Sequence, residues 1–323
     1  MSDLPTIDDV RAAAAVIAGR VHRTPVFSST TLGERCGAPC WLKAELFQRI
    51  GAFKPRGAFN RVHAMSADER ARGVISISAG NHAQALALAA RDEGVDALVL
   101  MPADASPAKV AAARGYGATV DLESPDPIHA MERMRAISAD TGRVIVHPYD
   151  DPLVVAGQGT VGLEMAEDIP GLDTVIVPIG GGGLISGIAV AVKALIPGVR
   201  VIGVEPELSP AMRTALDAGK PVPAVPGPTI ADALRAPVAG QIAFAVCSRL
   251  VDDVVLVSED EIRQGMRFLY ERAKLACEPG AAVGVAALLA RRIEVRGAGG
   301  VGLVISGGNV AGDVVAAQLS GPE

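Results

Sequence analysis

The sequence predicts an α/β protein with two domains, in which parallel-type twisted sheets are flanked by helices. Short β-branched segments alternate with Ala-rich helical segments along the chain, and this alternation is typical of parallel sheets. The length of 323 residues corresponds to two domains at about 150 residues each. The composition, 50% hydrophobic and 20% charged, excludes a disordered chain.

The first half of the chain begins with a helix and continues as alternating strands and helices. The first helix is predicted over 6–19, because Thr6 can cap its start and Gly19 ends it. Further helices are predicted over 54–65, 81–93, 107–116 and 126–141. Strands are predicted over 40–46, 73–77, 96–101, 118–122 and 143–147.

The second half repeats this alternation. Helices are predicted over 157–169, 184–195, 258–275 and 281–291, and strands over 173–178, 200–204, 254–257 and 301–305. The segment 221–228 contains four prolines and is predicted to be an ordered loop, since proline lacks the N–H that helices and sheets require.

Charge and hydropathy exclude several functions. The net charge of −6 disfavours binding to nucleic acid or to an anionic membrane. The longest apolar stretch, 281–290, is much shorter than the roughly 20 residues of a spanning helix. The first residues lack a basic region followed by an apolar one, and four cysteines are too few for a disulfide framework. We therefore expect a cytoplasmic protein with reduced thiols.

The first candidate site is the turn Gly180-Gly181-Gly182-Gly183-Leu184, which directly follows the strand 173–178. Glycines let an anion approach the backbone, and the start of the next helix presents free N–H groups. The turn lacks the Lys-Ser/Thr of a Walker A loop and the third glycine of a dinucleotide fingerprint. It therefore predicts a bound phosphate that is not part of a nucleotide. A merely flexible turn is the alternative.

The second candidate is Lys54, which lies between Phe53 and Pro55 at the predicted start of a helix. The helix dipole disfavours a positive charge at this end. The placement is explained if the amine forms a Schiff base or has a lowered pKa. A solvated surface lysine is the alternative.

Two further strand ends carry small polar residues. The turn Ser-Ala-Gly-Asn-His at 78–82 opens a helix, and its free amides and polar side chains suit a carboxylate. The turn Ser-Gly-Gly-Asn at 306–309 follows the last predicted strand. In both turns the polar side chains could instead serve only as caps.

In combination, these motifs resemble the fold-type II pyridoxal-phosphate enzymes. Residues 43–58 read Lys-x-Glu-x-x-Gln-x-x-Gly-x-Phe-Lys-x-Arg-Gly-Ala, and the turns at 78–84, 180–184 and 306–309 follow in the order of that family. Arg-Thr-Pro-Val at 23–26 also matches. The resemblance extends over nearly the whole chain. It is strongest to the threonine/serine dehydratases, with serine racemase close by.

The resemblance implies pyridoxal 5'-phosphate as cofactor and a fold like that of the tryptophan synthase β subunit. The large domain would comprise 1–49 and 149–323, and the small inserted domain 50–148. Lys54 would be the catalytic Schiff-base lysine, with Phe53 against the cofactor ring. Asn81 would bind the ring hydroxyl and Ser306 the ring nitrogen.

The remaining roles also follow from the resemblance. The cofactor phosphate would be bound by Gly180, Gly181, Gly182, Gly183 and Leu184. The substrate carboxylate would be bound by Ser78, Ala79, Gly80, Asn81 and His82. Glu278 would lie near the site. The racemase-like branch binds a divalent cation at the position of Glu205, but Ala211 replaces an aspartate of that site, so no metal is expected.

The implied reaction is α,β-elimination, which converts L-threonine or L-serine to a 2-oxo acid and ammonia. Racemisation of serine or another amino acid, and dehydration of another β-hydroxy amino acid such as 3-hydroxyaspartate, are the alternatives. A non-catalytic protein that binds the cofactor or an amino acid is a remote one. Racemases of this group look to have Ser where this chain has Ala79. Racemisation needs a proton donor on that face, so Ala79 favours a dehydratase. The family resemblance also implies a homodimer or homotetramer.

Overall fold

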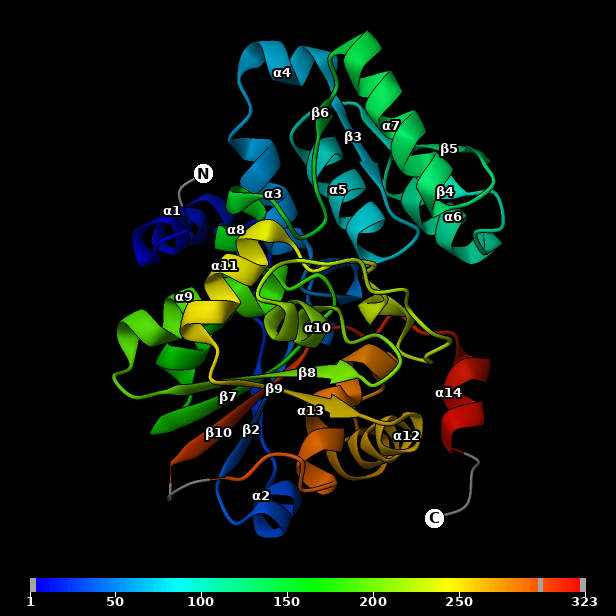
Figure 1. Ribbon diagram of the computed structural model, residues 1–323. Coiled ribbons are helices and arrows are strands. Elements are labelled where there is room, and N and C mark those ends of the chain that lie inside the picture. Colours follow the sequence, from blue (N-terminus) through cyan, green and yellow to red (C-terminus); the bar gives the residue numbers. More distant parts are fainter. Residues whose placement is uncertain (1–3, 296–298, 320–323) are drawn as a thin grey trace.

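The computed structural model describes residues 4–295 and 299–319, which form two sheets with helices on both faces of each (Figure 1). The large sheet has the strand order β1-β2-β10-β7-β8-β9, and the small sheet has the order β5-β4-β3-β6. Neighbouring strands pair in parallel, except that β1 and β2 are antiparallel. The predicted α/β class with parallel sheets is therefore confirmed.

The large sheet draws its strands from both ends of the chain. They are β1 (Val26–Ser28), β2 (Cys40–Ala44), β7 (Leu172–Pro178), β8 (Arg200–Pro206), β9 (Asp253–Val257) and β10 (Gly300–Ile305). One face is covered by α1 (Ile7–Ile17), α8 (Pro152–Asp168), α9 (Gly183–Leu195), α10 (Ala211–Ala218) and α11 (Gln241–Leu250). The other is covered by α2 (Thr30–Cys36), α12 (Glu259–Phe268) and α13 (Pro279–Leu289).

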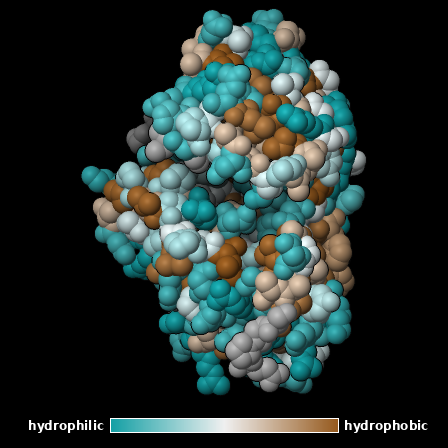
Figure 2. Space-filling model, turned by 90° about the vertical axis from the view of Figure 1, so that its right-hand side faces the viewer, coloured by the Kyte–Doolittle hydropathy of each residue, from teal (hydrophilic) through white to brown (hydrophobic). Residues whose placement is uncertain are grey.

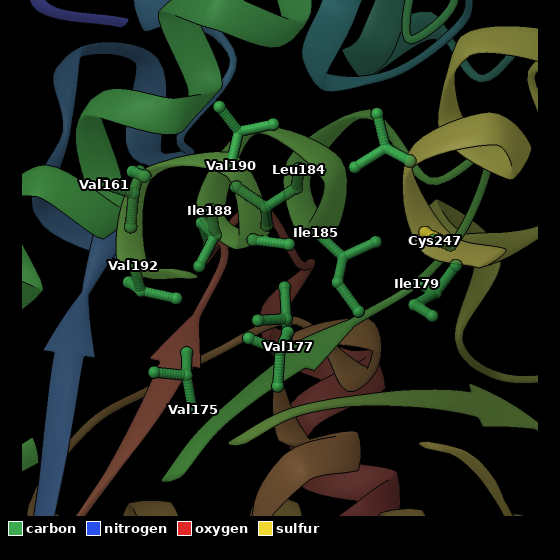
Figure 3. Packing of buried hydrophobic residues seen from close by; sticks show 14 of the residues in the cluster. Val161, Val175, Val177, Ile179, Leu184, Ile185, Ile188, Val190, Val192 and Cys247 are labelled. Atoms are coloured by element: carbon green, nitrogen blue, oxygen red, sulfur yellow. The ribbon is translucent and has the colours of Figure 1, made fainter. Parts of the chain in front are cut away.

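Alternate residues of β7 enter the two cores, since successive side chains of a strand point to opposite faces. Val177 points toward Ile185 and Ile188 of α9 (Figure 3). Its neighbour Ile176 packs in the cluster on the opposite face. A strand that is buried on both faces reads as a continuous apolar run, which explains why this strand was predictable.

The small sheet consists of consecutive strands. They are β3 (Val74–Ile77), β4 (Ala97–Pro102), β5 (Thr119–Ser124) and β6 (Val144–Ile145). α5 (Asn81–Asp92) and α6 (Pro107–Gly115) cover one face, and α7 (Pro127–Thr141) covers the other. α3 (Pro55–His63) contacts both α5 and α8, so it connects the two halves of the molecule.

Several predicted bounds are wrong. The strand predicted over 40–46 ends at Ala44, because a 3₁₀ turn η1 (Glu45–Phe47) directs Glu45 into the interior. The helix predicted from residue 157 begins at Pro152, since the Asp151 side chain accepts hydrogen bonds from the first free N–H groups. The helix predicted over 258–275 ends at Phe268 and continues as the π turn η4 (Leu269–Ala273).

Short elements were not predicted. They are β1, α2, α4 (Ala67–Arg72), η2 (Arg49–Gly51), α10, η3 (Asp232–Leu234), α11 and α14 (Gly312–Leu319). The four-proline segment 221–228 forms a loop, as predicted.

The surface shows no large apolar area on the side seen in Figure 2, where hydrophobic residues form small patches among hydrophilic ones. Within residues 4–295 and 299–319, every helix is too short or too polar to cross a bilayer.

Candidate active site

A cavity of about 400 Å³ lies where the carboxyl ends of β3, β7 and β10 face one another, the usual location of ligand sites in α/β sheets. Every residue for which a cofactor, substrate or nearby role was expected lines this cavity. These residues are Phe53, Lys54, Ser78, Ala79, Gly80, Asn81, His82, Gly180, Gly181, Gly182, Gly183, Leu184, Glu278 and Ser306. The tertiary structure thus brings together turns that are far apart in the sequence.

Lys54 directly precedes α3 and extends its amine into the cavity. Its Nζ donates a hydrogen bond to the carbonyl oxygen of Pro148 at 2.7 Å and lies 5.1 Å from the centre of the Phe53 ring. Burial lowers the pKa of Lys54 to about 8, against the opposing effect of the Glu278 carboxylate. A substantial fraction of the amine is therefore neutral near physiological pH, as attack on a carbonyl requires.

The turn that joins β7 to α9 accepts only glycine at several positions. Gly182 has a φ of 94°, which is costly for other residues. A Cβ on Gly181 would lie 2.3 Å from a ring carbon of Tyr149, and one on Gly183 would lie 2.9 Å from the Tyr149 carbonyl oxygen. The turn therefore presents bare backbone at the start of α9, where free N–H groups and the helix dipole favour an anion.

The turn between β3 and α5 forms another helix start in the cavity wall. The hydroxyl of Ser78 accepts a hydrogen bond from the Gly80 N–H at 3.2 Å. The His82 side chain is engaged elsewhere, since its Nε2 lies 3.1 Å from both the Ser76 hydroxyl and the Val146 carbonyl oxygen. Burial lowers the pKa of His82 to about 3. Its imidazole is therefore neutral, and it is the backbone of His82 that is available to a carboxylate.

Glu278 is held by a short chain of amides. The Asn81 side chain donates to both of its carboxylate oxygens, at 3.0 and 3.1 Å. Asn81 in turn accepts from Nδ2 of Asn309 at 2.8 Å, and the same nitrogen donates to the carbonyl oxygen of Ile50 at 2.7 Å. Burial raises the pKa of Glu278 to about 7, so a proton on this group titrates near neutrality.

Ser306 directly follows β10 and lies in the cavity wall. It is buried, and its carbonyl oxygen accepts a hydrogen bond from the Phe53 N–H at 3.1 Å. The next residue, Gly307, pairs with Ala52. These backbone contacts fix the position of Ser306 relative to the segment that carries Lys54.

The lysine motif also contains charged residues to which sequence analysis gave no role. Arg56 is fully buried and donates to both oxygens of Glu45 at 2.8 Å and to both of Glu164 at 2.6 and 2.9 Å. The ammonium of Lys43 contacts Glu164 at 2.5 Å. The motif therefore encodes a buried ionic network that anchors the first turn of α3 and, with it, Lys54.

Sequence analysis missed other residues of the cavity wall. Tyr149 packs its ring against the glycine turn and donates a hydrogen bond to the Val238 carbonyl oxygen at 3.1 Å. The position of Tyr149 after β6 could have marked it as a site residue, because other turns of the site also follow strands. Lys109 of α6 and Asp232 of η3 form an ion pair of 2.9 Å at the cavity. No motif marks either residue, and nothing in the sequence pairs them.

Glu205 lies outside the cavity lining. Its two oxygens accept hydrogen bonds of 2.8 Å from the N–H groups of Met212 and Arg213, so the carboxylate caps the start of α10. In the described parts of the chain, no three His, Cys, Asp or Glu side chains are grouped closely enough to hold a metal ion.

The cavity fits pyridoxal phosphate on the chemistry of its donors. The glycine turn supplies backbone N–H groups for a phosphate, and an added Cβ would close it. Lys54 supplies a partly neutral amine for an aldehyde. Ser306 and Asn81 supply polar groups that a pyridine ring with a hydroxyl substituent can use.

Known proteins resemble this chain in sequence and structure over most of their length. The chain is 44% identical over 305 residues to the L-threonine ammonia-lyase of Thermotoga maritima, an alignment that covers 94% of this chain and 76% of that protein. It is 42% identical to the L-threo-3-hydroxyaspartate ammonia-lyase of Saccharomyces cerevisiae, over 99% and 98% of the two chains. The structure of maize serine racemase superposes with a TM-score of 0.93 at 38% identity, covering 98% and 97%.

The family comparison agrees with the motifs. Residues 17–307 match the protein family described as pyridoxal-phosphate dependent enzyme. The chain therefore belongs to the pyridoxal-phosphate dependent enzymes, and pyridoxal phosphate is its cofactor.

Proposed function

We propose that this enzyme is a threonine/serine dehydratase, which converts L-threonine or L-serine to a 2-oxo acid and ammonia. The observation that carries the proposal is the pairing of Lys54, whose pKa is lowered to about 8, with the turn at 78–82 in one cavity. In that turn Ala79 supplies a methyl group, which cannot transfer a proton. The similarity to the L-threonine ammonia-lyase supports the same reaction.

The proposed mechanism assigns the proton transfers to Lys54. Bound pyridoxal phosphate supplies an electron sink for the charge that develops at Cα of the amino acid. In its neutral form, the Nζ of Lys54 would accept the proton from Cα of the bound amino acid. The electron pair of the former Cα–H bond would form a Cα=Cβ double bond as the Cβ–O bond breaks, and the departing hydroxide would take the proton from Nζ and leave as water. The resulting enamine would tautomerise to an imine, which water hydrolyses to the 2-oxo acid and ammonia. The Pro148 carbonyl oxygen, 2.7 Å from Nζ, orients the amine for both transfers.

The binding roles are part of the same proposal. The phosphate is bound by the glycine turn 180–183 and Leu184, and the substrate carboxylate by the N–H groups at the start of α5. Phe53 contacts the cofactor ring and Ser306 binds its nitrogen. Asn81 contacts the ring hydroxyl while it holds Glu278.

The test is an assay of 2-oxo acid formation from L-threonine and L-serine by the protein loaded with cofactor. Lys54→Ala should abolish product formation. Lys220→Ala is the matched control, because Lys220 is an exposed residue beyond α10. Wild-type protein that binds the cofactor but forms no oxo acid from either amino acid contradicts the proposal. That result would point to racemisation, to another β-hydroxy amino acid as substrate, or to a non-catalytic binding role.

Racemisation is distinguished by the chirality of the recovered amino acid. We expect serine recovered from the reaction to remain the L isomer, because Ala79 offers no donor on its face of the cavity. Ala79→Ser should then introduce detectable D-serine. Formation of D-serine by the wild type at a rate comparable to that of oxo acid would favour the racemase.

A specific observation favours 3-hydroxyaspartate as a second candidate substrate. Arg235 lines the cavity, and a second substrate carboxylate requires a cation of this kind; Lys109, which also lines the cavity, is already paired with Asp232 at 2.9 Å. The yeast relative named for this substrate aligns over nearly the full length of both chains. Arg235→Met should reduce kcat/KM for 3-hydroxyaspartate more than for threonine if the enzyme acts on the dicarboxylate.

We also propose that the protein is a cytoplasmic homo-oligomer with a small domain over 50–148. The strands of the small sheet all fall between residues 74 and 145, in support of that boundary. Phe27 and Phe47 form an exposed aromatic pair with ring centres 6.1 Å apart, which suits an interface between subunits. Light scattering after chromatography tests the oligomer, and a monomeric mass contradicts it.

A further inference from the structure

One buried side chain in the cavity wall lacks a partner in the protein. Gln158 of α8 is 1% exposed and lines the cavity together with Lys54. Neither its Nε2 nor its Oε1 has a hydrogen-bond partner among the residues that the structure describes. A few other buried polar atoms share this condition, including Trp41 Nε1 and Thr174 Oγ1, but those two residues do not line the cavity.

An unpaired amide at this place is costly to folding. Removing an amide from water without a compensating hydrogen bond is unfavourable, and native proteins pair the great majority of such groups. A methionine of similar length would fill the same space without that cost. The amide therefore points to a hydrogen-bonding partner supplied by a ligand.

The packing of α8 places Gln158 close to Lys54. A Cβ on Gly57 of α3 would lie 2.5 Å from Nε2 of Gln158. Gly57 follows Lys54 by three residues, so the two lie on the same side of the first turn of α3. The glycine leaves the space that the Gln158 amide fills beside this turn.

The packing also places Gln158 close to α9. A Cβ on Gly187 of α9 would lie 2.5 Å from the backbone nitrogen of Gly159, the next residue of α8. α9 starts at Gly183, directly after the glycine turn. Gln158 thus lies between the two helix starts that face the cavity.

We propose that Gln158 is a further cofactor-binding residue, whose side-chain N–H donates a hydrogen bond to an oxygen of pyridoxal phosphate between Lys54 and the glycine turn. The proposal rests on the cofactor site and does not depend on the substrate. The cofactor satisfies the donor that the protein leaves unpaired. Bound cofactor therefore contributes more to stability in the wild type than in a variant without this amide.

The experiment measures cofactor affinity and apo-protein stability for Gln158→Met. We expect the dissociation constant for pyridoxal phosphate to rise about tenfold, as for the loss of one hydrogen bond to a charged group. The Tm of the cofactor-free protein should stay equal or increase, because an unpaired amide is removed. Gln264→Met is the matched control, since Gln264 is exposed on α12 and lies outside the cavity lining. It should leave the dissociation constant unchanged.

Two results would overturn the proposal. One is a lower Tm of the cofactor-free variant with unchanged cofactor affinity, which would make Gln158 a structural residue. The other is unchanged cofactor affinity with a raised KM for the amino acid, which would make it a substrate contact. If Gln158→Met does not fold, Gln158→Glu keeps the size but replaces the donor with an acceptor, and it should weaken cofactor binding at least as much. None of these readouts requires turnover of threonine, so failure of the proposed reaction is detected separately.

Discussion

Asn81 donates hydrogen bonds to both carboxylate oxygens of Glu278, at 3.0 and 3.1 Å. Asn81 begins α5, which covers the small sheet, and Glu278 directly precedes α13, which covers the large sheet. The contact therefore joins the two sides of the cavity. It also orients a carboxylate that raises the pKa of Lys54 against the effect of burial.

Glu278→Gln should move the pH dependence of cofactor attachment downward. Burial lowers the pKa of Lys54 and the charge of Glu278 raises it. Without that charge the effect of burial dominates further, so the pKa of the amine falls below about 8. The neutral amine is the form that attacks the aldehyde, and attachment therefore becomes faster on the acidic side of the profile. We expect a shift of about 1 pH unit. The rate of absorbance change after cofactor is added to apo-protein, measured on both sides of pH 8, checks this. Asp8→Asn on the exposed first helix is the control, and an unchanged midpoint would contradict the expectation.

Disruption of the Lys109–Asp232 ion pair should raise the KM for the amino acid with little change in kcat. The pair spans the cavity at 2.9 Å but both side chains are about half exposed. Solvent screening limits its contribution to about 1 kcal/mol, or roughly a fivefold change. Lys109→Ala and Asp232→Ala should therefore have similar, salt-sensitive effects on KM. The exchanged pair Lys109→Asp with Asp232→Lys should recover much of the loss. A KM for the exchanged double variant that is higher than the KM of either single variant would show that the two charges act separately.

Arg56→Met should destabilise the fold by about 3–5 kcal/mol, because it leaves the fully buried Glu45 and the partly buried Glu164 without their guanidinium partner. Urea unfolding monitored by circular dichroism measures the change. Arg11→Met is the control, since its ion pair with Asp8 is exposed and contributes less than about 1 kcal/mol. An equal decrease in the free energy of unfolding for the two variants would mean that the buried network contributes no more to stability than an exposed ion pair.

Gly181→Ala should weaken cofactor binding and destabilise the protein by about 1–3 kcal/mol. The added methyl group would lie 2.3 Å from the Tyr149 ring, so either the ring or the turn must move. Gly115→Ala is the control, because a Cβ there meets nothing within 4 Å, and alanine is the better helix former. Combining Gly181→Ala with Tyr149→Ala should restore part of the stability. Titration with cofactor and thermal unfolding measure the two effects. A Gly181→Ala variant that binds cofactor as tightly as wild type and is equally stable would contradict the predicted clash.

The sequence alone was sufficient for the fold class and the family. Strands such as 173–178 are buried on both faces and therefore appear as continuous apolar runs, and the glycine turn follows such a strand directly. Lys54 stands out because it is a cation at the start of a helix. These signals are local, because the residues that a turn next to a strand end requires do not depend on distant segments of the chain. Short elements such as α2 and β1 lack such a signal, because a few residues do not establish a period.

Only the tertiary structure decided which partners these residues have. His82 belongs to the predicted carboxylate turn, yet its imidazole bonds to Ser76 and Val146 in the layer beneath. Arg56 belongs to the lysine motif. Only the packed structure shows that Glu164 of α8 completes its ionic network. Gln158 is an ordinary polar residue in the sequence, and its burial without a partner appears only when α3, α8 and α9 are packed together. Burial and pairing depend on contacts between distant segments, and those contacts set the pKa of Lys54 as well as the shape of the cavity.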